Sequence, residues 1–141
     1  MKRKTLTFVG AVLATYVVAA VLASNSVIAS VIAMGLPVDF GTRLEMIGHD
    51  VVGMTASYLP LIAVAFLIAF PAAGLLVRNR PALRTAIFIL AGIVAVLCIH
   101  FALKMTFDIA PVAAARTNVG LALQASAGAL GGYLFARFAV E

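Results

Sequence analysis

The chain has 141 residues, of which 65% are apolar, 11% are charged and 9% are aromatic, and it contains no tryptophan. Soluble domains are roughly 45–50% apolar and about 25% charged, so this chain carries far too much apolar surface for a fold in water. The composition excludes a secreted or cytosolic domain, a disordered tail and a nucleic-acid partner. In a membrane protein, the positions of the Lys and Arg residues that give the net charge of +5 indicate the orientation of the chain.

Four long segments without a charged residue are separated by short stretches that contain Lys, Arg, Asp or Glu. A charged side chain at the middle of a bilayer is costly, so such residues mark the ends of membrane spans. We expect spans at about residues 7–24, 51–77, 85–103 and 117–136. The expected fold class is an all-α integral membrane protein, a single-domain antiparallel bundle of four transmembrane helices.

The first segment is longer than a membrane span. It meets no charged residue between Lys4 and Asp39, and a helix of that length measures roughly 50 Å against a hydrocarbon core of roughly 30 Å. We expect this helix to extend on the outer side to about residue 34, before Gly35 and Pro37 end it. The alternative is a signal peptide cleaved after Ala23, because a basic start precedes an apolar stretch. An uncleaved span is the expectation.

The second segment is expected to begin outside the membrane. The stretch Thr42-Arg43-Leu44-Glu45 has the form of a capping box, in which a hydroxyl and a carboxylate each satisfy a backbone N–H of the first turn. The helix should start near Arg43, extend on the outer side, continue into the span and bend at Pro60 and Pro71. Further along the chain, Pro81 and Pro111 suit the first turns of the third and fourth helices.

The distribution of basic residues predicts the orientation. With both termini in the cytoplasm, seven of the ten Lys and Arg residues lie inside and three lie outside. The seven are Lys2, Arg3, Lys4, Arg78, Arg80, Arg84 and Arg137. The positive-inside rule therefore predicts a multi-pass protein of a bacterial-type inner (plasma) membrane, N-in and C-in.

The fourth segment carries a face of small and polar residues. Arg116, Gly120, Gln124, Gly128 and Gly132 follow one another at steps of four, which places them along one side of a helix. Lipid supplies little hydrophobic drive between helices, so association relies on small residues and on polar side chains that bond across. This face predicts close packing, either within the bundle or against another subunit.

Two histidines are expected at the outer level of the membrane. Glu45 and His49 share one helix face, and His100 lies about one turn before the outer end of the third segment. These three residues could bind zinc or non-haem iron, with Asp50 or Asp108 as a further ligand. His49 and His100 could instead hold a haem or exchange protons with a quinone. The remaining interpretation has Glu45 and His49 in solvent and His100 bonded to a carbonyl.

No motif in the sequence identifies an activity or a cofactor, because neither a G-x-S-x-G elbow nor a phosphate-binding loop is present. The nearly charge-free spans favour a non-catalytic integral membrane protein, an accessory or assembly subunit of a larger membrane complex. The alternatives are a haem-, metal- or quinone-binding protein that uses His49 and His100, and a small homo-oligomeric transporter. Expected partners are the lipid bilayer and either other membrane subunits or further copies of the chain.

Overall fold

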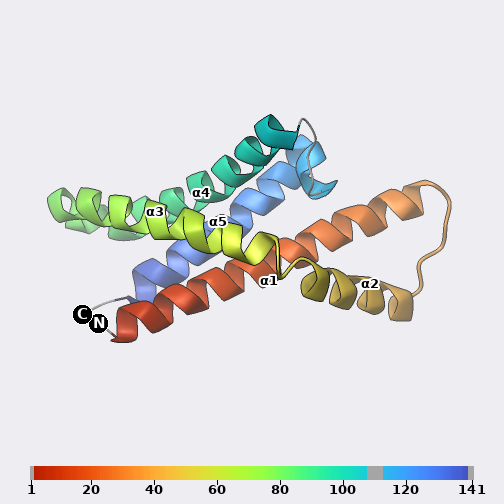
Figure 1. The fold of residues 1–141 in the computed structure, drawn as a ribbon, viewed down its shortest axis with the longest axis horizontal. Helices are drawn as coiled ribbons and strands as arrows, with labels where there is room; N and C mark the ends of the chain where they lie inside the picture. Colours follow the sequence, from red (N-terminus) through yellow and green to blue (C-terminus); the bar gives the residue numbers. More distant parts are fainter. Residues whose placement is uncertain (1, 108–112, 140–141) are drawn as a thin grey trace.

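The computed structural model describes residues 2–107 and 113–139, and Figure 1 shows the arrangement of its helices. The elements in chain order are α1 (Lys2–Ala33), α2 (Phe40–Gly53), α3 (Tyr58–Asn79), η1 (Pro81–Leu83), α4 (Arg84–Phe107), η2 (Ala113–Arg116) and α5 (Asn118–Phe138). Helices α1, α3 and α5, and the segment formed by η1 and α4, are long and apolar enough to cross a membrane. The all-helical class and the four candidate spans are thereby confirmed.

The four long helices are arranged so that each packs against two others. Helix α4 lies against α5 and α3, while α1 lies against α5 and α3. Each helix contributes side chains to one shared core, which includes Ala19 of α1, Ile62 and Phe66 of α3, Val96 of α4 and Ala127 of α5. Both chain ends lie together at one end of this bundle (Figure 1).

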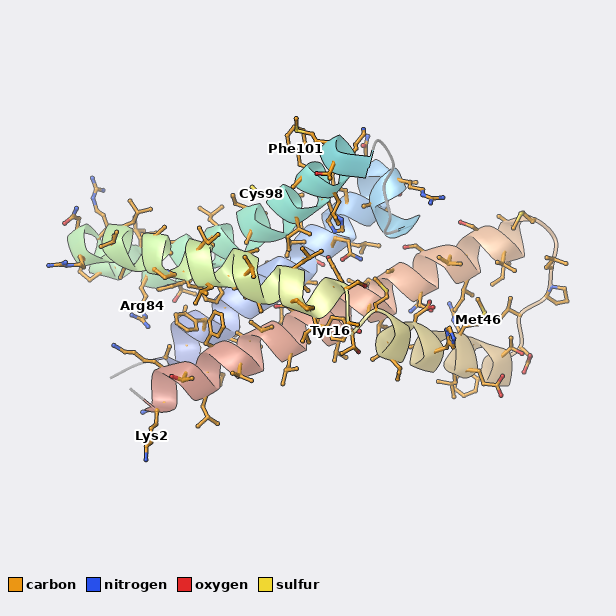
Figure 2. The ribbon with its side chains drawn as sticks, in the orientation of Figure 1. Lys2, Tyr16, Met46, Arg84, Cys98 and Phe101 are labelled. Carbon is orange, nitrogen blue, oxygen red and sulfur yellow. The ribbon has the colours of Figure 1, made fainter. Side chains whose placement is uncertain are left out.

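The outward surface of the bundle is apolar. Leu67 of α3 and Phe101 of α4 expose 63% and 66% of their surface, and Figure 2 shows Cys98 and Phe101 on the outward side of α4. Exposed apolar side chains of this kind cover much of every long helix. Such a surface is unfavourable in water and suits contact with lipid.

The second apolar segment is divided between two helices, which differs from the continuous helix expected from Arg43 to residue 77. Helix α2 ends at Gly53 and α3 begins at Tyr58, with backbone hydrogen bonds of the Met54 and Tyr58 amides closing the turns between them. Pro60 favours the break without requiring it, because in a continuous helix its ring would clash with a carbonyl one turn earlier, whereas Pro71 lies inside the continuous helix α3. In the structure Pro60 lies in the first turn of α3, where no N–H is required.

Helix α2 begins earlier than predicted because Asp39 caps it. The Asp39 carboxylate accepts hydrogen bonds from the backbone amides of Gly41, at 3.0 Å, and Thr42, at 3.4 Å, and from the Thr42 hydroxyl. The bonds from Thr42 hold the pKa of Asp39 below its usual value. The predicted capping box of Thr42 and Glu45 is therefore wrong, and the helix starts at Phe40 instead of near Arg43.

Helices α4 and α5 approach until their backbones touch. A Cβ atom added at Gly92 would overlap the Gly128 carbonyl, and one added at Gly128 would overlap the Gly92 carbonyl. A Cβ atom at Gly132 would overlap the carbonyl of Phe88. The small residues at Gly128 and Gly132 thus lie against α4 inside the bundle, where glycine is the residue that permits this separation.

We predict that Gly128→Ala destabilises the bundle by about 1–3 kcal/mol, the usual cost of overpacking a close contact. The matched control is Gly74→Ala in α3, where an added Cβ meets no atom within 4 Å. Because alanine is the better helix former, the control should leave stability unchanged or slightly higher. Thermal unfolding in detergent measures both effects. Equal losses at the two positions would contradict the close contact.

Candidate functional site

Polar groups from four helices form one buried chain of hydrogen bonds. The Tyr58 hydroxyl on α3 donates to Oε1 of Gln124 on α5 at 3.0 Å and lies 3.1 Å from Nε2 of His100 on α4. Nε2 of Gln124 donates to the Ala19 carbonyl of α1 at 2.9 Å. The side chains of Tyr58, His100 and Gln124 are almost completely buried. This set, which we call the Tyr58 network, connects α1, α3, α4 and α5.

The donors and acceptors of the Tyr58 network can be assigned one after another, starting from the Ala19 carbonyl. The Ala19 carbonyl only accepts, so the Gln124 amide must turn its nitrogen toward it and its oxygen toward Tyr58. The Tyr58 hydroxyl therefore donates its one proton to Gln124 and accepts from His100. The network thus assigns a proton to Nε2 of His100.

Each member of the Tyr58 network depends on the others. An unpaired amide, hydroxyl or imidazole in an apolar interior has no water available to replace a missing partner. The network therefore favours one register of α3 against α4 and α5.

A second tyrosine fastens α2 to the bundle. The Tyr16 hydroxyl on α1 donates to the Val51 carbonyl in the last turn of α2 and lies 3.0 Å from the Thr55 hydroxyl. Carbonyls in the last turn of a helix lack an intrahelical donor, so Tyr16 satisfies one of them. Its ring lies beside that of Tyr58, with 6.5 Å between centroids, where α1 meets the start of α3 (Figure 2).

The structure does not bring the proposed metal ligands Glu45, His49 and His100 together. The His49 side chain is 88% exposed on α2, with its Nδ1 atom 3.9 Å from the Asp50 carboxylate, and Glu45 is also exposed. His100 is buried against Tyr58. Among residues 2–107 and 113–139, no three His, Cys, Asp or Glu residues form a group that could hold a metal.

The break after α2 accounts for this separation. The sequence reasoning placed His49 and His100 at one level on two adjacent spans, but α2 is a separate helix that packs chiefly against α1. His49 and His100 therefore lack a shared partner in the described part of the chain. Asp108, the other proposed ligand, lies outside the described residues.

The face predicted on the fourth segment divides at the helix start. Gly120, Gln124, Gly128 and Gly132 are buried residues of α5. Arg116 belongs to η2 and is exposed. Thr117 caps α5 by accepting a hydrogen bond from the Gly120 amide at 3.0 Å, so the helix begins after Arg116. The part of the face on α5 thus combines a close backbone contact with the Gln124 hydrogen bonds.

Sequence reasoning missed Tyr16 and Tyr58, although a signal was present. Both are tyrosines inside apolar segments, and a buried tyrosine needs a partner for its hydroxyl. Gln124 and His100 were identified as polar residues within spans, so pairing either with a tyrosine was a possible inference. No family model, curated protein or solved structure matches the chain.

We predict that Tyr58→Phe destabilises the protein by about 1–3 kcal/mol, because it leaves Oε1 of Gln124 and Nε2 of His100 without the hydroxyl they share. Tyr133→Phe is the matched control, since Tyr133 is 44% exposed on α5. Thermal unfolding in detergent compares the two variants. A Tyr58→Phe protein as stable as the control would show that the network contributes nothing to stability.

Proposed function

We propose that the chain is a non-catalytic membrane protein that serves as an accessory or assembly subunit of a larger membrane complex. The observation that carries this proposal is an apolar surface outside the bundle. Residues 25–53, which we call the arm, comprise the last part of α1, the following connection and α2. Figure 1 shows the arm extending away from α4 and α5.

The arm is too long to lie within the membrane with the rest of α1. A helix of 32 residues is about 48 Å long, whereas the hydrocarbon core is about 30 Å thick. With the basic start of α1 at one membrane surface, its other end reaches well beyond the opposite surface. Helix α2 lies beside this outer part of α1 (Figure 1).

The arm is held in position while its outer side is left apolar. Arg43 of α2 donates a 3.0 Å hydrogen bond to the side chain of Asn25, and Tyr16 bonds to Val51, so α2 is fixed to α1 at two levels. None of the α2 residues is buried. Large apolar side chains with roughly half or more of their surface exposed are Ile32, Met34, Leu36, Phe40, Leu44 and Val52.

A protein partner suits this surface better than the membrane surface does. Helices that lie on anionic membranes carry Lys and Arg on their polar side. Helix α2 has one basic residue, Arg43, and two acidic residues, Glu45 and Asp50. A fixed apolar surface with an acidic border is the kind of surface that another subunit would cover.

The contacts at the other end of the bundle and the basic residues there support an antiparallel bundle in a bacterial-type inner membrane, with both termini in the cytoplasm. Arg84 at the start of α4 donates hydrogen bonds to the carbonyls of Ala136 and Ala139 at the end of α5. The α3–α4 connection therefore shares one end of the bundle with the C-terminus and the N-terminus (Figure 1). That end carries the basic residues which the positive-inside rule assigns to the cytoplasm.

We predict that Asn79→Cys is protected from an impermeant thiol reagent added to intact cells, whereas Leu36→Cys is labelled. Both variants are made in a Cys98→Ala background, since Cys98 is exposed. Leu36 is 57% exposed and lies in the connection between α1 and α2, so a cysteine there is accessible to the reagent. Labelling of both variants after the cells are opened is the control, and the reverse pattern in intact cells would overturn the orientation.

We predict that a photo-crosslinking amino acid at Phe40 captures a specific membrane protein, because Phe40 is 76% exposed on the arm. The matched position is Val119, which is 73% exposed at the start of α5 and outside the arm. Cross-linked products are identified by mass spectrometry in the native membrane. Leu44→Gln should abolish the Phe40 product without changing thermal stability.

Three outcomes would contradict the proposed function. Cross-links from Phe40 to lipid alone would assign the arm to the membrane surface. Identical protein products from Phe40 and Val119 would indicate random collision. Cross-links to further copies of the chain alone would replace the accessory role with a homo-oligomer.

A further inference from the structure

The bundle has an open hollow at the end that holds both termini. Its volume is about 1010 Å³, and residues of α1, α3, α4 and α5 line it. The hollow extends along α3 from Arg78 to Leu67. Eleven residues of helix correspond to about 16 Å, roughly half the thickness of a hydrocarbon core. The hollow thus has the depth of one leaflet of a bilayer.

The wall of the hollow is built from four phenylalanines that contact one another. Phe70 of α3 stacks on Phe135 of α5 with 4.5 Å between ring centroids, and Phe8 of α1 packs edge-on against both. Phe88 of α4 packs against Phe70 and Phe135. Every ring is held by at least two others, so the wall is rigid. Phe70 and Phe88 are only 3% exposed and form its base, while the half-buried Phe8 and Phe135 and the exposed Leu67 supply the apolar surface that a hydrocarbon chain can contact.

The mouth of the hollow is basic. Lys4, Arg78, Arg84 and Arg137 contribute to its lining, and no Asp or Glu occurs among the described residues that line it. Four cationic side chains from α1, α3, α4 and α5 therefore surround one opening. Such a mouth attracts an anion, and basic pockets between membrane helices are typical sites for anionic lipid headgroups.

Arg84 connects the mouth to the wall. Its Nε and Nη2 atoms donate to the Ala136 and Ala139 carbonyls at 3.1 and 3.0 Å, and its guanidinium lies 5.3 Å from the centre of the Phe88 ring. Figure 2 shows Arg84 at this end of the bundle. These contacts fix the guanidinium in place and leave further N–H donors of its planar group for an anionic ligand.

We propose that this hollow binds an anionic membrane phospholipid. The headgroup phosphate contacts the basic mouth, and one acyl chain lies along the accessible apolar lining formed by Phe8, Phe135 and Leu67. A zwitterionic phospholipid offers the same acyl chain but adds a cation that the mouth repels. The proposal concerns the opposite end of the molecule from the arm and does not depend on the accessory role.

Because the chain contains no tryptophan, a single introduced tryptophan is the only source of tryptophan fluorescence, and its quenching provides a direct test. Leu67→Trp places the reporter in the hollow, and Ile68→Trp places it one residue further along, outside the lining. Both positions are similarly exposed, at 63% and 69%, and differ in depth by about 1.5 Å. The full chain is reconstituted in phosphatidylcholine vesicles that contain phosphatidylglycerol, with bromine on the acyl chains of one lipid at a time.

Quenching at Leu67→Trp should show a preference for phosphatidylglycerol of about fivefold or more. Quenching at Ile68→Trp should show no preference, because that position meets bulk lipid. The double change Arg78→Gln and Arg137→Gln should reduce the preference at Leu67→Trp toward one. Lys104→Gln, which removes a charge near the other end of α4, should leave it unchanged.

Three results would overturn the proposal. The first is an equal preference at the two reporter positions. The second is a preference at Leu67→Trp that survives the loss of both arginine charges while the vesicle charge is unchanged. The third is a reporter at Leu67→Trp that neither brominated lipid quenches, which would mean that protein, such as a second copy of the chain, fills the hollow.

Discussion

The Tyr58 hydroxyl occupies the position on which the packing of the long helices depends, since it is the group that His100 and Gln124 share. In hydrocarbon there is no water to accept the proton of Tyr58 or to donate to Gln124. If α3 slid along α4 and α5, both bonds of the Tyr58 hydroxyl would be lost together. Gln124 would stay bonded to the Ala19 carbonyl, but its Oε1 atom would lose its donor. The cost of such a shift makes the observed register the favoured one.

The glycine contact between α4 and α5 makes this network possible. Gly128 lies one turn beyond Gln124 on the same face, so the close approach of the two backbones also brings Gln124 toward α4. A bulkier residue at Gly92 or Gly128 would separate the helices and lengthen the distance that Tyr58 has to span. Close packing and hydrogen bonding thus reinforce each other, as expected where lipid provides little drive for helix association.

The sequence was sufficient to predict the helical class and the four candidate spans, which follow from charge and length, and the end of α1, which follows from Gly35 and Pro37. It did not predict the break before α3, since Pro60 permits either a kinked helix or a new helix start. The cap was misassigned because Asp39 and Thr42 are both residue types that cap helices, and the sequence does not show which of them the helix follows; in the structure Asp39 accepts from the amides of Gly41 and Thr42. The Tyr58 network was missed because hydropathy and spacing do not indicate which faces of different helices meet.

The two tyrosines also relate the arm to the core. Tyr16 binds the last turn of α2 through Val51, and its ring packs beside Tyr58, which in turn contacts His100 and Gln124. The Tyr16 ring is itself buried in the shared core, so its position is fixed by packing as well as by the bonds of its hydroxyl to Val51 and Thr55. One aromatic pair therefore joins the point where α2 ends to the group that aligns the long helices.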